Sequence, residues 1–283
     1  MTRPRRSILY LPAANTRAIV KARTLDSDAV ILDLEDAVAP AMKEAARAAA
    51  VAAARDDWGH RELLLRVNGL TTPWSEADFA AIENSGFAGI VVPKVDSAAD
   101  ALVAVSRAHG RPVWAMIETP RGVLAAAAIA AVPGVTALVA GMADLTNDLR
   151  AQPGPDRLPL VYALSAIVVA ARASDIMALD GVFTDLADAA GLHAEAAQGR
   201  SFGFDGKTLI HPSQIDTANA VFGLSPAEIT DAGELIAVYE EALADGRGVT
   251  THRGKLVEVL HVAGARRLLA TAAAIAARDQ SSA

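Results

Sequence analysis

Two acidic residues and one arginine follow short apolar runs of the kind that form buried parallel strands. Glu118 ends the run WAMIE, Asp144 ends ALVAGMAD, and Arg66 ends ELLLR. In an α/β barrel, the side chains at the carboxyl ends of the strands carry the chemistry. Carboxylates are ligands that Mg²⁺ prefers, and a guanidinium binds carboxylates through two parallel hydrogen bonds. The sequence therefore predicts a Mg²⁺ site at Glu118 and Asp144, both facing solvent at a barrel mouth, beside an anion-binding Arg66.

Plainer structural roles are open for the same residues. Asp144 could cap the helix that follows it, and Arg66 could form a surface salt bridge. Lys94, which ends the run VVPK, could form a structural ion pair or act as the Schiff-base lysine of an aldolase. A metal site beside it favours metal-stabilised enolate chemistry over a Schiff base.

A third acidic segment, DLEDAV (33–38), also follows an apolar run and places three carboxylates within four residues. Such acids repel one another unless a cation or a hydrogen-bond donor offsets their charge. Because Mg²⁺ keeps several waters in its shell, Glu35 and Asp36 could hold metal-bound water. The alternative is a solvated strand end that caps the next helix.

Eight apolar segments alternate with alanine-rich helical patterns, which predicts parallel strands joined by helical crossovers. The expected strands are 7–11, 29–34, 62–67, 89–94, 113–118, 137–141, 176–183 and a segment within 203–210. Eight such units favour a closed TIM (β/α)8 barrel over residues 1–212. Residues 213–283 form a predicted helical extension, with helices over 226–246 and 262–280 and a short polar segment, but no strand, between them.

Composition excludes several classes of protein. The chain has 283 residues, of which 52% are hydrophobic, a net charge of −7 and no cysteine. The absence of cysteine rules out disulfides, thiolate catalysis and cysteine-ligated metals, and the acidic balance argues against a nucleic-acid partner. The apolar run near the N-terminus is too short for a secretory signal, and the run 123–132 is too short to span a bilayer. We expect a soluble, cytoplasmic protein with no membrane partner.

Seven ordered segments resemble one known family, the HpcH/HpaI aldolase and citrate lyase family, in its citrate lyase beta-subunit-like branch related to malyl-CoA lyases. They are RSILYLPA, VILDLEDAV, LLLRVN, VVPK, MIETP, DGVFTD and GFDGKTLIHPSQ, between Arg6 and about Gln214. The resemblance implies a TIM barrel assembled as trimers or hexamers, with Mg²⁺ as its cofactor.

The resemblance also implies roles for individual residues. Mg²⁺ would lie on Glu118 and Asp144, and Arg66 would hold the carboxylate of an oxo-acid. Glu35 and Asp36 would support metal-bound water. The substrate carboxylate would also meet backbone amides of the segment Gly141, Met142, Ala143 and Asp144, and Arg17 and Lys21 match positions that contact coenzyme A phosphates.

Two departures from the family pattern stand out. Relatives of the malyl-CoA lyase type carry an aspartate in a GKMID-like segment, where it acts as an acid in a neighbouring active site; this chain reads GKLVE, with Glu258 at that position. Relatives read GAEDL where this chain reads GMADL, so that Ala143 replaces an acid.

The first function expected from this reading is a Mg²⁺-dependent carbon–carbon lyase. It would cleave a citryl-, malyl- or citramalyl-type 3-hydroxy-acyl thioester, carried by coenzyme A or an acyl carrier protein, into an oxo-acid and an acyl thioester. A malate synthase or malyl-CoA thioesterase would use the same enolate chemistry and is the alternative. A coenzyme A-independent pyruvate aldolase and a non-catalytic subunit of a lyase complex are also open.

Overall fold

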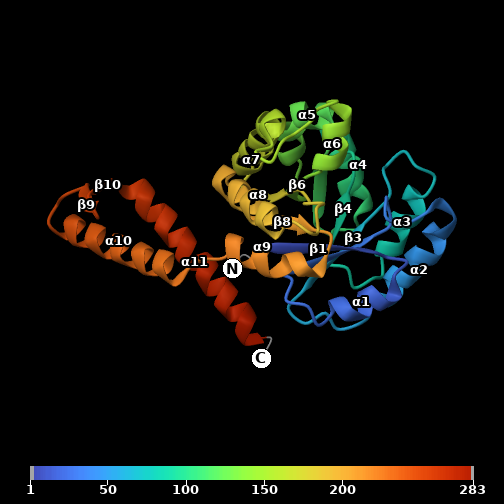
Figure 1. Cartoon of the computed structure of the whole chain (residues 1–283), viewed down its shortest axis with the longest axis horizontal. Coiled ribbons are helices and arrows are strands. Elements are labelled where there is room, and N and C mark those ends of the chain that lie inside the picture. Colours follow the sequence, from blue (N-terminus) through green and yellow to red (C-terminus); the bar gives the residue numbers. More distant parts are fainter. Residues whose placement is uncertain (1–2, 282–283) are drawn as a thin grey trace. The chain divides into compact units, whose positions relative to one another are not determined.

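The computed structural model describes residues 3–281 and contains a closed barrel of eight parallel strands (Figure 1). The strands follow one another around the barrel in chain order, and β1 closes it by pairing with both β2 and β8. The strands are β1 Ser7–Pro12, β2 Ala29–Asp33, β3 Glu62–Arg66, β4 Gly89–Val92, β5 Val113–Ile117, β6 Val135–Ala140, β7 Met177–Asp180 and β8 Gly206–Leu209. Each overlaps an expected segment, so the predicted α/β barrel is confirmed.

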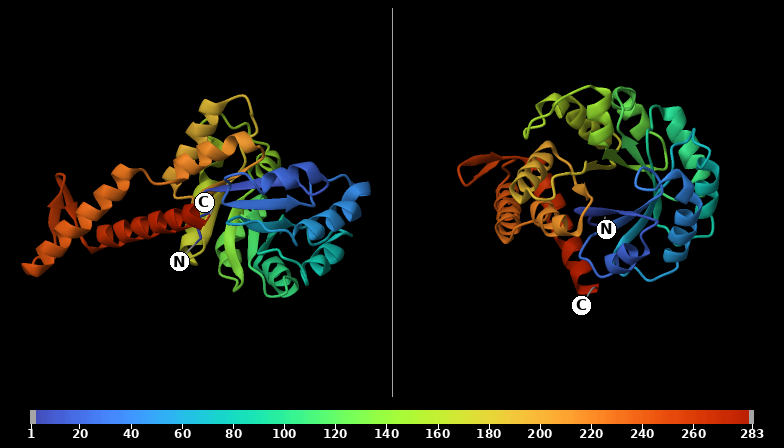
Figure 2. Two further views of the ribbon diagram at one scale, coloured as in Figure 1. Left: turned by 90° about the horizontal axis from the view of Figure 1, so that it is seen from below. Right: turned by 45° about the vertical axis from the view of Figure 1, so that its right-hand side comes forward.

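Helices surround the strands (Figure 2). They are α1 Thr16–Ala22, α2 Lys43–Ala53, α3 Ser75–Ile82, α4 Ala98–Arg107, α5 Pro120–Ala130, α6 Met142–Asp148, α7 Val161–Ala173, α8 Ala189–Phe202 and α9 Ile215–Phe222, with 3-10 turns at Pro40–Met42, Leu158–Leu160 and Pro212–Gln214. The start of α5 shows how the sequence sets these boundaries. Thr119 accepts a hydrogen bond from the backbone N–H of Gly122, and Pro120 occupies the first turn, where its missing N–H costs nothing.

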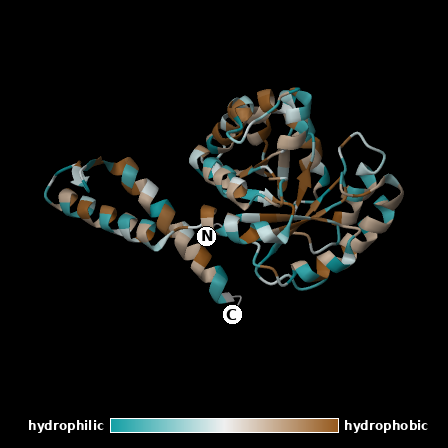
Figure 3. Ribbon diagram, viewed as in Figure 1, coloured by the Kyte–Doolittle hydropathy of each residue, from teal (hydrophilic) through white to brown (hydrophobic). Residues whose placement is uncertain are grey.

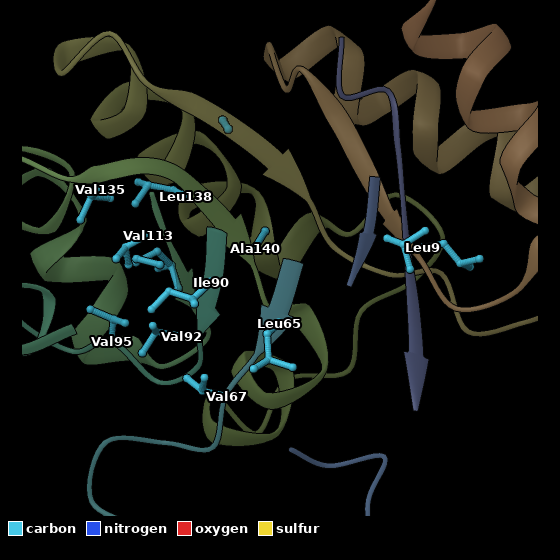
Figure 4. Close-up of a cluster of buried hydrophobic side chains, with 14 of the residues drawn as sticks. Leu9, Leu65, Val67, Ile90, Val92, Val95, Val113, Val135, Leu138 and Ala140 are labelled. Atoms are coloured by element: carbon cyan, nitrogen blue, oxygen red, sulfur yellow. The ribbon is translucent and has the colours of Figure 1, made fainter. Parts of the chain in front are cut away.

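Alternate residues of each strand face two separate apolar layers. One set fills the barrel interior: Ile8, Ala29, Ile31, Leu64, Val91, Trp114, Met116, Ala137, Val139 and Leu179. The other set packs under the helices, and Figure 4 shows part of it, including Leu65, Ile90, Val113 and Leu138 from neighbouring strands. Because both faces are buried, the strands are almost continuously hydrophobic, as Figure 3 shows. This is why the strands were predictable.

The chain divides into two compact units, Arg5–Phe222 and the segment that begins at Gly223. This division lies later than the boundary expected after residue 212, because α9 packs with the barrel. Ile215 and Phe222 are buried in the barrel's outer layer, and Ser7 of β1 donates a hydrogen bond to Asn219 of α9 (2.7 Å). Helix α9 therefore belongs to the barrel unit and packs against β1 and β8.

The second unit, described by itself, is a helical hairpin with a small sheet. It contains α10 Pro226–Ala244, β9 Thr250–His252, β10 Lys255–Val257 and α11 Val259–Ser281. Its apolar centre is small: Tyr239, Val257 and Val262. The expectation of no strand between the helices was wrong, because Arg253 and Gly254 both adopt positive φ (47° and 77°) and form the two-residue turn of a β-hairpin.

Helix α11 is rich in alanine. Within the described residues, it is the one helix long and apolar enough to cross a membrane by length and composition, over Val259–Gln280. Length and composition alone are a weak indication of a membrane segment, so the expectation of no membrane partner stays a prediction.

Candidate functional site

The alternation of the strands carries three charged side chains into the mouth of the barrel. Asp33, Arg66 and Glu118 each lie two residues beyond an inward-facing apolar residue, namely Ile31, Leu64 and Met116. Side chains two residues apart on a strand share one face, so all three point inward at the carboxyl ends of β2, β3 and β5. Asp33 and Arg66 are also register partners in the ladder between β2 and β3.

Arg66 directs its guanidinium fork to Asp33. Its Nε and Nη2 donate to the two carboxylate oxygens (2.7 and 2.6 Å), while Nη1 lies 2.9 Å from Glu35 Oε2. The guanidinium also stacks over the ring of Tyr10, 4.9 Å from its centroid. Burial would lower the pKa of Arg66, but the hydrogen bonds and charge of Asp33 outweigh it and raise that pKa. Arg66 is therefore a fixed cation whose bidentate face, expected for substrate, pairs with Asp33.

The exit of β2 is held by two buried groups. Asp33 accepts hydrogen bonds from the backbone N–H groups of Glu35 and Ala37 (2.8 and 3.2 Å). The Lys43 ammonium donates to the backbone carbonyls of Leu34 and Glu35, both at 2.7 Å. These contacts fix the turn that presents the Glu35 and Asp36 side chains.

Glu118 is buried, with 2% of its surface exposed, which corrects the expectation that it faces solvent. The backbone N–H of Lys94 donates to its Oε1 (2.7 Å). Burial, followed by repulsion from Glu35 and Asp144, raises the pKa of Glu118 to about 7, against the lowering effect of Lys94. Gly141 leaves the room that this side chain uses, since a Cβ there would lie 2.5 Å from Glu118 Oε2.

Asp144 lies in the first turn of α6, and its side chain is 41% exposed. The residue at the cap of this helix is Gly141, and no side chain caps it, so Asp144 does not serve as the N-cap. Asp144 Oδ2 lies 3.5 Å from the Lys94 ammonium, which is also 3.2 Å from Glu35 Oε1. Lys94 thus links Glu35, which follows β2, to Asp144, which follows β6.

Lys94 forms the ion pairs that were one of its two interpretations. Burial would lower its pKa, but the charges of Glu35, Glu118 and Asp144 outweigh burial and raise it. A Schiff-base lysine needs a neutral amine. The surroundings of Lys94 favour the charged form and so argue against that role.

A cavity of about 440 Å³ brings most of the predicted site residues together at the barrel mouth. Its lining includes Asp36, Arg66, Glu118, Gly141, Met142, Ala143 and Asp144. Glu35 lines an adjoining cavity of about 620 Å³, which Asp36 also lines. Arg17 and Lys21 lie on α1, exposed and outside both linings. Glu258 belongs to the C-terminal unit, where it is half-buried just before α11 and its backbone N–H donates to His261 Nδ1 (3.0 Å).

Sequence reasoning missed two residues of this mouth. Asp33 was grouped with its neighbours but not recognised as the partner of Arg66. Tyr10 was not singled out, yet it lines the cavity, and its hydroxyl faces Met116 Sδ at 3.7 Å. Burial raises the pKa of Tyr10, so its phenol stays protonated and can donate. The inward parity of β1 and β2 was the signal that could have found both.

The donor set suits a hard divalent cation. Glu118 and Asp144 supply carboxylate oxygens, the ligands that Mg²⁺ prefers, and Glu35 and Asp36 can hold water in its shell. The repulsion that raises the pKa of Glu118 is relieved by a bound cation. The residues present therefore fit Mg²⁺.

Comparison with known proteins identifies the family of the chain. The family model for HpcH/HpaI aldolase/citrate lyase matches residues 6–212. A (3S)-malyl-CoA thioesterase from Cereibacter sphaeroides is 47% identical over 97% of this chain and 96% of its own length. A citrate lyase subunit beta from Leuconostoc mesenteroides is 36% identical over 94% of this chain and 93% of its own length.

A solved structure gives the same result for the fold. The protein CitE from Mycobacterium tuberculosis, in complex with magnesium, acetoacetate and coenzyme A, superposes with a TM-score of 0.82 at 30% identity. The match covers 96% of this chain and 98% of that one. The resemblance seen in the ordered sequence segments is confirmed.

Proposed function

The chain belongs to the HpcH/HpaI aldolase/citrate lyase family, and from that premise we propose that it is a Mg²⁺-dependent thioesterase for a malyl-type coenzyme A thioester. The observation that carries the proposal is the 47% identity to a (3S)-malyl-CoA thioesterase over 97% of the chain. This favours the alternative from the sequence over the lyase reaction expected first.

The residues of the mouth divide the work of such a hydrolysis. Glu118 and Asp144 would hold Mg²⁺, which supplies Lewis acidity that polarises a carbonyl. Because Asp33 occupies the fork of Arg66 and Glu35 lies beside Nη1, Arg66 would attract a substrate carboxylate mainly through its positive charge. Glu35 and Asp36 would orient water for attack on the thioester.

The properties of Glu35 and Tyr10 support the same assignment of roles. The pKa of Glu35 is raised by burial, against the lowering effect of Arg66, which makes its carboxylate a better proton acceptor than an exposed one. The Tyr10 phenol can donate a hydrogen bond within the same cavity. Both groups are held by Arg66, so the guanidinium organises the base, the phenol and the substrate carboxylate together.

The lyase reaction is the second candidate, since a citrate lyase beta subunit is 36% identical to this chain. In that case the same mouth would stabilise the enolate of the departing acyl thioester. Both candidates share the metal, the thioester and Arg66, and they differ in whether the C–S or a C–C bond breaks.

One assay separates the two candidates. The purified enzyme is incubated with malyl-CoA and Mg²⁺, and free thiol, malate and glyoxylate are measured. Hydrolysis gives equal amounts of free thiol and malate, whereas cleavage gives glyoxylate and acetyl-CoA without free thiol. Glyoxylate without thiol would reject the thioesterase. Turnover of a free 2-oxo-acid aldol with no dependence on coenzyme A would reject both in favour of a pyruvate aldolase.

A further inference from the structure

We infer that Lys94 is a built-in counter-cation of the carboxylate cluster that competes with the divalent ion for Asp144 and sets the metal affinity of the site. The inference rests on the metal site of the proposed function, at Glu118 and Asp144, and not on which thioester reaction follows. It assigns a function to a residue that the proposed reaction does not use.

The backbone of Lys94 adopts a conformation that lysine rarely takes. Its φ is 51°, in the left-handed region that costs a residue with a Cβ free energy. This conformation points the Lys94 N–H at Glu118 Oε1 (2.7 Å) and leaves the side chain to cross the mouth of the barrel. Strain of this kind persists where surrounding contacts hold it in place, and here both ends of the residue contact acids.

The side chain places its ammonium between two acids that come from different strand exits. The Nζ atom lies 3.2 Å from Glu35 Oε1 and 3.5 Å from Asp144 Oδ2. Glu35 also has Arg66, whose Nη1 is 2.9 Å from Oε2. Asp144, by contrast, forms its ion pair with Lys94, and the described residues show no second cation paired with it.

A divalent ion held by Glu118 and Asp144 would meet the ammonium at Asp144. Two cations near one carboxylate repel each other, so binding of the ion favours an ammonium that gives up Asp144. The side chain can do so because it is 47% exposed and Glu35 remains as its partner. Meanwhile the backbone N–H that holds Glu118 needs no movement. Lys94 therefore balances the charge of the metal-free site and weakens the binding of the ion that replaces it.

A purely structural ion pair predicts the opposite effect. If Lys94 only holds Asp144 and Glu35 in position, its removal loosens the ligands and weakens metal binding. The two roles are thus separated by the direction in which the affinity changes.

The test is a calorimetric titration of the full-length protein with MgCl₂. We expect Lys94→Met to bind Mg²⁺ about tenfold more tightly than the wild type, a difference of about 1.4 kcal/mol. Lys94→Gly should behave in the same way, because glycine accepts the positive φ and keeps the N–H to Glu118. Lys94→Arg keeps the charge and should bind Mg²⁺ no more tightly than the wild type.

Arg23→Met is the matched control. Arg23 follows α1 and forms an exposed ion pair with Asp56 (3.0 Å), so this variant removes one positive charge away from the strand exits that carry the acids. Its Mg²⁺ affinity should equal that of the wild type. An equal gain in Arg23→Met would mean that net charge alone is responsible and would overturn the inference.

The remaining outcomes also decide the matter. Wild-type or weaker Mg²⁺ affinity in Lys94→Gly overturns the role of Lys94, even if Lys94→Met fails to fold. A larger rise of Tm on adding saturating Mg²⁺ in Lys94→Met than in the wild type supports it, because ligand binding stabilises the native state by mass action. Failure of the metal site itself is recognised separately, as unchanged Mg²⁺ affinity in Glu118→Gln.

Discussion

Two of the clusters of acids and cations among the described residues, one at the barrel mouth and one in the C-terminal unit, behave differently. At the barrel mouth, Asp33 and Glu118 are almost fully buried, and the pKa of Glu118 rises to about 7. In the C-terminal unit, Asp231 accepts from His252 Nε2 (2.8 Å) and pairs with Arg253 (3.0 Å), which also bonds Glu234 (2.8 Å). There the pKa of Asp231 is lowered, first by the hydrogen bond from His252.

The two clusters contain similar residue types, but one is exposed to solvent and the other contains buried acids. Ligand atoms of Asp231, Glu234 and His252 lie within 4.8 Å of one another, a spacing that a metal could use. However, the side chains of Asp231 and Glu234 are solvent-exposed, and Arg253 already forms an ion pair with each of them. At the mouth, burial keeps acids at close range with fewer cations than they need, and this imbalance is what a metal ion relieves.

The largest difference between the clusters should appear on removing one carboxylate from each. Glu118→Gln or Asp144→Asn should lower Mg²⁺-dependent turnover on the order of 10³-fold, since a Lewis acid supplies several kcal/mol of charge stabilisation. Asp231→Asn should leave the Mg²⁺ affinity unchanged. Turnover and calorimetric Mg²⁺ titrations of the three folded variants check this. Near-normal metal affinity in Glu118→Gln would remove Glu118 from the site.

The second effect asks whether the C-terminal unit takes part in the reaction. The family resemblance gives Glu258 the role of an acid in a neighbouring active site, which makes it a candidate proton donor. Glu258→Gln should then lower kcat on the order of 10²-fold without changing the Mg²⁺ affinity. Glu258→Asp should keep kcat at the wild-type value or raise it. The exposed Glu240→Gln is the control. Full turnover in Glu258→Gln would move the proton source to metal-bound water held by Glu35 and Asp36.

A third effect concerns the free energy of unfolding and its dependence on pH. The pKa of Glu118 is raised from 4.5 to about 7 by burial and then by Glu35 and Asp144. Its contribution to stability is therefore fully present below pH 4.5 and is lost as the pH rises through 7. A shift of this size corresponds to about 3 kcal/mol. Urea unfolding with a chelator should show this loss in the wild type but not in Glu118→Gln. Parallel curves for the two proteins would contradict it.

Much of the fold could be predicted from the sequence because the barrel strands are buried on both faces and read as apolar runs. The β-hairpin of the C-terminal unit was missed because its strands are short and polar, and its turn needs positive φ at Arg253. The attachment of α9 includes a hydrogen bond between Ser7 and Asn219, which are far apart in the chain. Local patterns carry no signal for either feature.

The site was predictable in its residues but not in its pairings. Glu118, Asp144 and Arg66 line one cavity as expected. However, the sequence did not reveal that Asp33 takes the fork of Arg66, because the register of β2 against β3 decides it. Nor did it reveal the positive φ of Lys94.

A fourth effect compares the two arginines. Arg66→Lys keeps the charge but loses one of the two bonds to the buried Asp33, which should cost about 2 kcal/mol of stability and weaken substrate binding. Arg253→Lys, which changes an exposed pair, should leave the unfolding midpoint unchanged. Chemical unfolding of both variants and the KM of Arg66→Lys are the measurements. Equal midpoints for the two variants would mean that the Asp33 pair contributes no more than a surface contact.

The smallest effect belongs to the exposed cluster itself. The hydrogen bond from His252 lowers the pKa of Asp231, against the raising effect of burial. The contribution of Asp231 to stability is therefore present above about pH 4 and is lost as the pH falls through its folded-state pKa. Asp231→Asn should therefore lower the hydrogen-exchange protection of β9 and β10 at neutral pH. In acid, the variant and the wild type should show the same protection. The change should stay local, since solvent screens the pair. The barrel amides serve as the internal control, and a loss of protection there would show that the two clusters are not energetically separate.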